Sequence, residues 1–500
     1  MTKLLRSHGR VALWLAWALP FLVYALSAYR TVGFWDTGEM DTVPWILGIA
    51  HSTGFPAYVL GGWIFAHVVP IGSVAYRMGL FGGLAMSLAA WLIAKTVNEE
   101  HDAPWIGAAC AWMFAFGDIA WTRGTRAEVH ALAMLSIAAT IYLALRWYAT
   151  GDARALIGGA LAWAVGLATH PVAALIAPGL LLLLVARART LRAKPLLAAV
   201  ALCAVTTAAF YAYLPLRSAY VTAHAVDPTR ALGLPPGRAF WDYDHPSTRA
   251  GFLNEVLGAD FDAAGGVRSI LSPDGYVARG PHFLQIFVDE FTPVGAALVI
   301  FGIVTGFGRN PIRSGALLLA AFASVPFALG FTQEADPDRY FLTAFLVGSI
   351  FAGDGAMWFA REATRYRWAV PSAIALIAAV LFFLNRGALA QPRDNRATGV
   401  VDRVLALTSP TGILVCSWVD ATPLAYAAYV EHRTQGRTID AAWIGDDAAY
   451  VPRWLRTRRV YLIGSIFGKV PGYRFETISA DPAVYLVVPM DRPPAGRSKS

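Results

Sequence analysis

Long apolar runs, separated by short polar stretches, make up most of the chain. A helix that crosses the hydrocarbon core of a bilayer needs about 20 largely apolar residues. We therefore predict eleven membrane spans, with a break at His170-Pro171 because proline interrupts a helix. The predicted spans are residues 11–28, 78–97, 104–121, 129–147, 155–173, 173–186, 196–214, 293–308, 314–331, 340–360 and 369–385.

Three other segments do not have the pattern of a span. The apolar stretch Ala57–Val69 is too short to cross, and we interpret it as a re-entrant or interfacial helix. Residues 215–290 form a long loop rich in Pro, Gly and Asp, which usually indicates function or disorder. Residues 387–500 alternate between strand-like and helical runs, so we predict a small α/β domain that follows a transmembrane domain at 1–386. The strand-like runs are Ile413–Cys416, Val460–Ile463 and Val484–Val488, and the helical stretch is Pro423–His432.

Basic residues indicate which side of the membrane each loop occupies, because cytoplasmic loops carry an excess of Lys and Arg. With the N-terminus inside, most basic clusters fall inside, although the acidic loop 98–102 disagrees. We therefore predict a multi-pass protein of the cell inner (cytoplasmic) membrane. Loops 29–77 and 215–290 and the C-terminal domain then lie on the non-cytoplasmic side. The inside residues are Arg146, Arg154, Arg187, Arg189, Arg192, Lys194, Arg309, Arg313, Arg361, Arg365 and Arg367.

Composition supports a polytopic α-helical membrane protein and excludes other classes. The chain is 57% hydrophobic and only 15% charged, whereas soluble domains are about one quarter charged. Its net charge of +8 comes from short clusters between apolar runs, so nucleic acid is not an expected partner. The three cysteines have neither the number of a disulfide framework nor the spacing of a zinc site.

The first predicted outer loop holds three carboxylates in six residues, Asp36, Glu39 and Asp41. If the segment is helical, Asp36 and Glu39 share a face, and each can influence the protonation of the other. One of them is then a candidate general base at the membrane surface. A solvated acidic loop is the alternative, but the neighbouring Trp35 and His51 favour a folded interfacial site.

The second predicted outer loop places two arginines on the side where basic residues are least expected. Arg126 and His130 are four residues apart, so they can face one ligand from the start of a span. A phosphate would suit the fork of guanidinium donors. Alternatively, Arg123 or Arg126 forms an ion pair with Glu128 or with an acidic residue of the first loop, and the sequence leaves both interpretations open.

Weaker signals lie elsewhere on the predicted outer face. His170 ends the fifth span and Arg217 opens the long outer loop, but each has a structural alternative, as a helix-end histidine or a snorkelling arginine. Asp336 and Asp338 form an Asp-x-Asp pair that is suited to a divalent ion. The proline between them and the adjacent Arg339 equally suggest an ion-paired turn.

Common nucleotide and hydrolase motifs are missing from the sequence. It has no P-loop, no dinucleotide fingerprint, no His-Glu-x-x-His and no nucleophile elbow in a usable context. The predicted spans are also nearly free of ionisable residues, which argues against an ion-coupled transporter with a site at the midplane. Any chemistry is therefore expected at the membrane interface.

Several short motifs follow one another in a fixed order along most of the chain. They are Asp36-Thr37-Gly38-Glu39, His51-Ser52-Thr53-Gly54-Phe55-Pro56, Ala127-Glu128-Val129-His130-Ala131-Leu132, Tyr213-Leu214-Pro215-Leu216-Arg217-Ser218 and Asp338-Arg339-Tyr340. This ordered set resembles membrane glycosyltransferases of the GT-C superfamily, specifically the bacterial family similar to protein O-mannosyltransferases. The chain departs from that family at Ser52-Thr53, where two prolines are common, and at Phe55 and His130, where tyrosine is common.

The resemblance implies transfer of a sugar, with mannose as one candidate, from a polyprenyl-phosphate donor to an acceptor hydroxyl by single displacement. Asp36 is the implied base, with Glu39 as its partner or substitute. The acceptor is a protein, lipid or glycan, and no cofactor is expected unless Asp336 and Asp338 hold a metal. We expect the donor phosphate to bind Arg123, Arg126, Arg217 and Arg339, and the substrates to contact His51, Glu128, His130, His170 and Asp338.

Two other kinds of function remain open at the level of sequence. A lipid-linked sugar carrier or flippase would need charged groups along a path through the membrane, which the spans lack. A non-catalytic scaffold, with the tail binding a partner or a cell-wall glycan, would need far fewer spans. Sugar transfer explains best why acidic, basic and histidine residues recur on one side.

Overall fold

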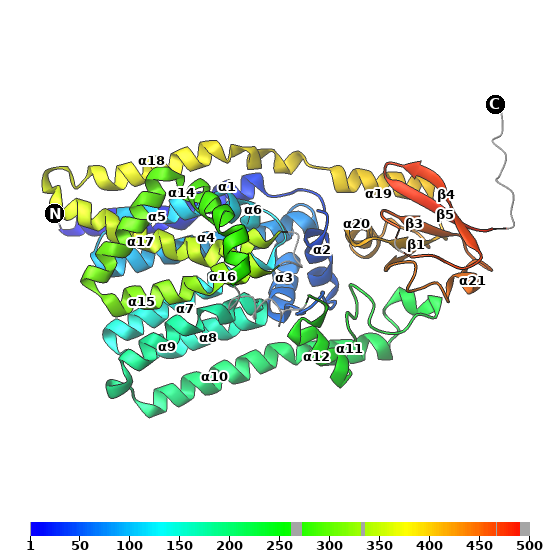
Figure 1. The fold of residues 1–500 in the computed structure, drawn as a ribbon, viewed down its shortest axis with the longest axis horizontal. Helices are drawn as coiled ribbons and strands as arrows, with labels where there is room; N and C mark the ends of the chain where they lie inside the picture. Colours follow the sequence, from blue (N-terminus) through cyan, green and yellow to red (C-terminus); the bar gives the residue numbers. More distant parts are fainter. Residues whose placement is uncertain (1, 262–272, 332–335, 467, 491–500) are drawn as a thin grey trace.

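In the computed structural model, a bundle of helices and a smaller sheet domain lie end to end along the longest axis of the molecule (Figure 1). The structure describes residues 2–261, 273–331, 336–466 and 468–490. Residues 262–272 of the predicted outer loop therefore lie outside the described part of the chain. The long bundle helices run roughly along this axis, so their turns gather at its two ends.

The bundle is built mainly from apolar helices that alternate in direction. Its α-helices are α1 (Thr2–Ser27), α4 (Val74–His101), α5 (Pro104–Ala115), α6 (Asp118–Gly124), α7 (Val129–Thr150), α8 (Ala153–Thr169), α9 (Ala177–Ala186), α10 (Ala193–Tyr211), α14 (Pro273–Arg309), α15 (Pro311–Phe322), α16 (Ser324–Gly330), α17 (Leu342–Glu362) and α18 (Ala369–Leu384). Its 3-10 helices are η1 (Pro171–Ile176), η2 (Ala188–Thr190), η5 (Pro337–Phe341) and η6 (Thr364–Tyr366).

Among the described residues, seven helices are long and apolar enough to cross a membrane, and a bent pair of helices would make eight. The chain is therefore a multi-pass membrane protein. Three predicted spans, 104–121, 155–173 and 173–186, correspond to apolar helices of 10 to 17 residues. The total of eleven spans is not confirmed and stays a prediction.

The division between the fifth and sixth predicted spans falls where proline was expected to place it. Helix α8 ends at Thr169, and the chain turns at His170 before η1 begins at Pro171. The Nδ1 atom of His170 accepts a hydrogen bond from the backbone N–H of Val172 at 3.1 Å, which caps the new helix.

A buried charged group lies at one end of the bundle, and Asp354 is its one member within a predicted span, 340–360. Asp354 of α17 is 4% exposed and accepts hydrogen bonds from Arg313 at 2.7 Å and from His101 at 2.8 Å. Arg309 donates to His101 at 2.7 Å and to Glu100 at 2.5 Å. Glu100 belongs to the acidic loop 98–102, which disagreed with the predicted topology. Its charge is neutralised by Arg309 and Arg313 of later helices.

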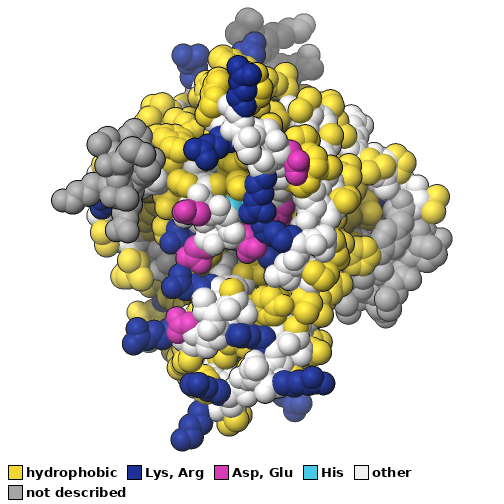
Figure 2. All heavy atoms as spheres, turned by 90° about the vertical axis from the view of Figure 1, so that its left-hand side faces the viewer, with side chains coloured by type: hydrophobic (Ala, Val, Ile, Leu, Met, Phe, Trp, Pro, Cys, Tyr) yellow, Lys and Arg dark blue, Asp and Glu magenta, His cyan; other side chains and the backbone are white. Residues whose placement is uncertain are grey.

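Lysine and arginine gather on the end of the bundle that is farthest from the sheet domain (Figure 2). The turns between α9 and α10, α14 and α15, and α17 and α18 lie at this end, and they contain most of the basic residues of the predicted inside loops. The predicted inside and outside loops thus lie at opposite ends of the molecule. Which end faces the cytoplasm stays a prediction.

Two short helices, α2 (Asp36–Ile46) and α3 (Pro56–Val68), run across the long axis between the bundle and the sheet domain (Figure 1). Helix α3 lies one residue earlier at each end than the apolar stretch Ala57–Val69, and its re-entrant or interfacial position in the membrane stays a prediction. The predicted outer loop 215–290 is largely helical, which corrects its description as a loop. Its described elements are α11 (Tyr213–Ala223), η3 (Pro228–Leu232), α12 (Arg249–Leu257), η4 (Ala259–Phe261) and the start of α14.

The C-terminal segment folds into a five-stranded sheet with the order β2-β1-β3-β5-β4. Strands β1, β2 and β3 are parallel, whereas β5 is antiparallel to both β3 and β4. The small α/β fold is confirmed. Its elements are η7 (Arg386–Arg393), α19 (Arg396–Leu407), β1 (Ile413–Cys416), α20 (Trp418–Tyr429), β2 (Thr438–Ala441), α21 (Val451–Trp454), β3 (Val460–Ile463), β4 (Tyr473–Ala480) and β5 (Ala483–Pro489).

One hydrophobic core joins the sheet domain to the crosswise helices. It contains Val43 of α2, Tyr58 of α3 and Leu424 of α20, all of them fully buried. The domain is therefore packed against the bundle rather than tethered to it, and this packing fixes the position of α2, on which the candidate site is built.

Candidate active site

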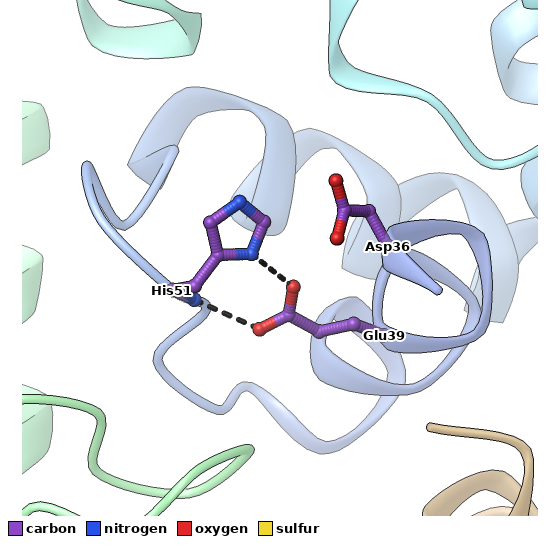
Figure 3. A group of neighbouring side chains, drawn as sticks. All are labelled: Asp36, Glu39 and His51. Carbon is purple, nitrogen blue, oxygen red and sulfur yellow. Dashed lines mark hydrogen bonds and ion pairs between the residues drawn. The ribbon is translucent and has the colours of Figure 1, made fainter. Parts of the chain in front are cut away.

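Helix α2 carries the two acidic residues that the sequence singled out. Trp35 has φ 55° and ψ −146°, outside helical geometry, and Asp36 and Glu39 follow in the first turn. The N-terminus of a helix has a partial positive charge, which stabilises carboxylates there. The predicted shared face is confirmed, because both side chains lie on the side of His51 (Figure 3).

Asp36 stands between the bundle and the sheet domain. Its Oδ1 accepts a hydrogen bond from Nε1 of Trp418 at 3.1 Å, and its Oδ2 lies 3.6 Å from a guanidinium nitrogen of Arg339. Burial acts to raise the pKa of Asp36, but the charges of His51 and Arg339 and the Trp418 hydrogen bond outweigh it and hold this pKa below its ordinary value. Asp36 is therefore an ionised, half-buried carboxylate at neutral pH.

Glu39 is fully buried behind Asp36 and binds His51. Its Oε1 accepts the backbone N–H of His51 at 2.8 Å, and its Oε2 forms an ion pair with the Nδ1 atom of the same residue (Figure 3). Burial acts to lower the pKa of His51, but the charges of Glu39 and Asp36 prevail and raise it to about 9. His51 is thus a cation at neutral pH, and Glu39 supports it instead of facing a substrate.

The same three residues have the geometry of a potential metal group. One ligand atom each from Asp36, Glu39 and His51 lies within 4.8 Å of the others. Two carboxylates and an imidazole are donors that divalent ions accept. The nitrogen of His51 that faces Glu39 carries the shared proton, so a metal would have to displace that proton first.

A second charged group surrounds Glu128, which caps the N-terminus of α7. Its Oε2 accepts from Arg123 at 3.1 Å and from Arg126 at 3.4 Å, and its Oε1 accepts from Nδ1 of His130 at 2.8 Å. Burial acts to raise the pKa of Glu128, but the charges of His130, Arg339 and Arg123 hold it well below its usual range. The ion-pair alternative for the two arginines is thus observed.

Asp336 reaches the same two arginines. It forms an ion pair with Arg123 and lies 3.9 Å from Arg126. Asp338 instead lies 3.0 Å from Nε2 of His282. The structure thus places the two carboxylates of the Asp-x-Asp pair against different partners, Arg123 and His282.

Aromatic rings and histidines lie together beside Asp36 in one cavity. The ring centroids of His130 and His170 are 4.5 Å apart, and each of these rings lies within 6 Å of Tyr340, at 5.3 Å and 5.9 Å. The ring of Phe55 stacks on His170 at 5.5 Å. These side chains come from four separate segments, which the bundle brings together.

Two cavities meet at the charged residues. The smaller has a volume of about 670 Å³ and is lined by the aromatic and histidine group, while the larger has about 2630 Å³ and lies between the bundle and the sheet domain; both volumes include open solvent. Four residues line both cavities: Asp36, His51, Glu128 and Arg339. A molecule in either cavity therefore reaches the same carboxylate.

The structure brings most of the predicted site residues to these cavities. Arg123 and Arg126 line the larger one, and His130 and His170 line the smaller one. Three predicted residues, Glu39, Arg217 and Asp338, line neither.

Arg217 lies outside both cavities, and its expected role at the donor phosphate stays a prediction. Its guanidinium donates to the backbone oxygen of Ile46 at 3.1 Å and lies over the ring of Tyr220. It therefore binds the end of α2 and turns away from the charged group around Asp36.

Several residues at the site were missed. Trp418, Trp443 and Tyr243 line the larger cavity, and Tyr340 lines the smaller one. Trp418 follows directly after the predicted strand at 413–416, and ligands of open α/β sheets bind beyond the carboxyl ends of parallel strands. That rule was the available signal for Trp418.

The comparisons with known proteins agree with this architecture. The family described as the N-terminal domain of the protein O-mannosyl-transferase TMEM260 matches residues 36–193, beginning at Asp36. The protein O-mannosyl-transferase tmem260 of Dictyostelium discoideum is 30% identical over 129 residues, which are 25% of this chain and 16% of that protein. TMEM260 of Mus musculus is 33% identical over 125 residues, which are 25% of this chain and 18% of that protein. The chain thus matches less than a fifth of each relative's length.

The fold is similar to that of ArnT from Cupriavidus metallidurans. The crystal structure with undecaprenyl phosphate has a TM-score of 0.60 at 11% identity and covers 94% of this chain and 96% of ArnT. The apo structure has a TM-score of 0.54 at 12% identity and covers 96% and 98%. The chain thus shares the fold of ArnT, and its N-terminal part is similar to the protein O-mannosyl-transferases, in agreement with the resemblance found in the sequence.

Proposed function

We propose that the chain is a membrane glycosyltransferase that moves a sugar from a polyprenyl-phosphate donor to an acceptor hydroxyl by single displacement. The observation that carries this proposal is the meeting of two cavities at an ionised carboxylate, Asp36, which lies beside a guanidinium, Arg339. Two substrates that enter from different sides would come together at this point.

Asp36 is the base in this scheme. It takes the proton from the acceptor hydroxyl while the hydroxyl oxygen attacks the anomeric carbon of the donor sugar. The bond between that carbon and the phosphate oxygen breaks, and the polyprenyl phosphate leaves with its electron pair. One displacement inverts the configuration at the anomeric carbon.

The guanidinium groups of Arg339, Arg126 and Arg123 stabilise the leaving phosphate, because aligned donors are worth most where charge develops in the transition state. Arg339 lies 3.6 Å from Asp36 and 3.9 Å from Glu128, and is thus at the centre of the charged group. The undecaprenyl phosphate bound to ArnT, whose fold is shared, supports a carrier of this kind.

We assign the sugar of the donor to the smaller cavity. Its histidines and Tyr340 offer both polar groups and ring faces for a sugar. The acceptor enters through the larger cavity, beside the sheet domain. The O-mannosyl-transferase names of the curated relatives make mannose the first sugar to test and a polypeptide hydroxyl the first acceptor.

The membrane side is part of the proposal. Basic turns gather at the end of the bundle opposite the two cavities (Figure 2), and such turns favour the cytoplasm. Transfer would then occur on the non-cytoplasmic face of the inner membrane, where the C-terminal domain also lies. Reaction of a cysteine at Ser247, an exposed residue of the predicted outer segment, with an impermeant reagent in outer-permeabilised cells would support this orientation, and protection there would overturn it.

The proposal is tested by transfer with purified full-length protein. Labelled polyprenyl-phosphate mannose, and the same carrier with other sugars, is mixed with peptide, lipid or glycan acceptors. We expect Asp36→Asn to lower the rate by about 100-fold or more, as loss of a general base does. The matched control is Asp481→Asn, because that carboxylate is 86% exposed and pairs only weakly with Arg403 at 3.7 Å.

Two outcomes would contradict the proposal at different levels. Transfer that is unchanged in Asp36→Asn would exclude Asp36 as the base. If the folded wild-type protein, checked by its thermal stability, transfers sugar from none of the donors, a carrier or a scaffold would be favoured.

A further inference from the structure

Trp418 is the first residue of α20, directly after strand β1. Strand β1 pairs in parallel with β2 on one side and with β3 on the other. The carboxyl ends of these strands therefore meet at one edge of the sheet, and this edge borders the larger cavity through Ser417, Trp418, Ala442 and Trp443. In open α/β sheets this is the edge at which ligands bind.

The indole of Trp418 is fixed on three sides. Its Nε1 donates to Oδ1 of Asp36 at 3.1 Å. Its ring stacks on Phe240 at 5.6 Å with an interplanar angle of 3°, and meets His51 edge-on at 6.1 Å and 90°. The direction of the N–H group is thus set by packing, so the hydrogen bond to Asp36 does not depend on a freely rotating side chain.

The helix that carries Trp418 is itself held against the helix that carries Asp36. Gly38 of α2 approaches α20 so closely that a Cβ atom there would lie 2.8 Å from Oγ1 of the buried Thr422. The hydroxyl of Tyr426, two turns after Trp418, accepts the backbone N–H of Ala75 at 3.1 Å. The donor and the carboxylate therefore belong to two elements with a fixed separation.

We propose that Trp418 is a positioning residue for the base, supplied by the C-terminal domain. The inference rests on the proposed function of Asp36. The indole N–H binds Oδ1, which fixes the rotation of the carboxylate and leaves Oδ2, on the side of Arg339, to take the proton of the acceptor. It also stabilises the ionised form of Asp36, as hydrogen bonds to a charged group do. Without the C-terminal domain, the bundle would lack the hydrogen bond that orients the Asp36 carboxylate.

The decisive variant is Trp418→Phe, which keeps an aromatic ring over Phe240 but has no N–H. We expect kcat to fall on the order of ten-fold, the usual cost of a hydrogen bond to a charged group. We also expect the acidic limb of the pH profile of kcat/KM to move to higher pH, because Asp36 loses a group that favours its charged form. The KM for the acceptor should stay within about two-fold, since the indole is assigned to the base and not to the acceptor.

The matched control is Trp454→Phe. Trp454 lies in the same domain, and its Nε1 also donates across to the bundle side, to the backbone oxygen of Leu232 at 2.9 Å, far from Asp36. If Trp418→Phe slowed transfer only by loosening the domain, Trp454→Phe would slow transfer equally. Equal slowing in the two variants, or a wild-type pH profile in Trp418→Phe, would overturn the inference.

A single-atom replacement covers the case in which Trp418→Phe does not fold. Replacing the indole of Trp418 with benzothiophene puts sulfur in place of N–H at nearly the same shape. We expect the same fall in kcat and the same shift of the acidic limb. A large rise of the acceptor KM with an unchanged acidic limb would show instead that Trp418 binds the acceptor. Wild-type protein without transfer would contradict the proposed function, whereas active wild type with an unaffected variant would contradict only this inference.

Discussion

Charges of opposite sign alternate around Asp36, so each cation at the candidate site already faces a carboxylate. A donor phosphate would add negative charge and would have to compete for its guanidinium groups. Asp336 is the carboxylate best placed to give way, because its side chain is 46% exposed while that of Glu128 is only 6% exposed. At the scale of the residue, Asp336 thus contacts the two arginines, Arg123 and Arg126, that we propose for the donor phosphate.

Asp336→Asn should therefore strengthen binding of the donor. The amide keeps the shape of the side chain but removes the charge that competes for Arg123 and Arg126, so we expect the KM for the polyprenyl-phosphate sugar to fall about three- to ten-fold. Initial rates at varied donor concentration measure this. Asp402→Asn, at an exposed carboxylate paired with Arg433, is the control. A higher KM would mean that Asp336 holds the two arginines in place.

The pair of Glu39 and His51 should make stability depend on pH. The pKa of His51 is raised from its ordinary value of 6.5 to about 9 in the folded protein. Its contribution is therefore fully present below pH 6.5 and is lost as the pH rises through about 9. We expect Tm in detergent to fall over this interval, and to fall less in the double variant Glu39→Gln with His51→Gln, which has no charge there. Equal slopes would contradict the charged pair.

Residue roles were predictable from the sequence where neighbours in the chain are neighbours in space. Asp36 and Glu39 share a helical turn, and His51 follows after one short loop, so the first charged group was found. The contact of Arg217 with Ile46 was not predictable, because the sequence shows that Arg217 opens an outer segment but not which backbone oxygen its side chain reaches. Trp418 was missed because it comes from a distant part of the chain.

At the scale of elements, the contact between α2 and α20 holds the site together. A Cβ atom on Gly38 would lie 2.6 Å from the backbone oxygen of Gly33 and 2.8 Å from Oγ1 of Thr422. Glycine is thus required for the close approach of the two helices. The distance between the base and the sheet domain depends on this one residue.

Gly38→Ala should separate the two helices. The new methyl group meets a backbone oxygen that cannot move away cheaply, so we expect a loss of about 1–3 kcal/mol of stability and slower transfer. Tm and the transfer rate measure the two effects. Gly399→Ala in α19 is the control, because a Cβ there meets nothing within 4 Å and alanine favours a helix. Equal Tm values and equal transfer rates in the two variants would show that α2 and α20 can accommodate a methyl group at Gly38.

The elements themselves were predicted unevenly. Strands β1 and β3 have the predicted bounds, because short apolar runs between turn residues are distinctive. Helix α20 spans Trp418–Tyr429, so it begins five residues before the predicted helical stretch Pro423–His432. The outer segment appeared to be a loop because proline and glycine separate helices that are individually short.

At the scale of the whole molecule, composition and hydrophobic runs were enough to predict a multi-pass membrane protein, and the ordered motifs indicated the superfamily. The buried charge at the far end of the bundle was not predictable. Asp354, Arg313 and His101 lie on three different helices, and only the assembled bundle shows that they neutralise one another. Removing one partner from such a group leaves a buried charge uncompensated.

The two cavities that meet at Asp36 have a consequence for the order of events in a catalytic cycle. Under the proposed assignment of donor and acceptor to separate cavities, both substrates can be bound at once, and no sugar has to be held covalently on the enzyme in between. Double-reciprocal plots at several fixed acceptor concentrations should intersect, as for a ternary complex, whereas parallel lines would indicate a covalent glycosyl-enzyme and ping-pong turnover.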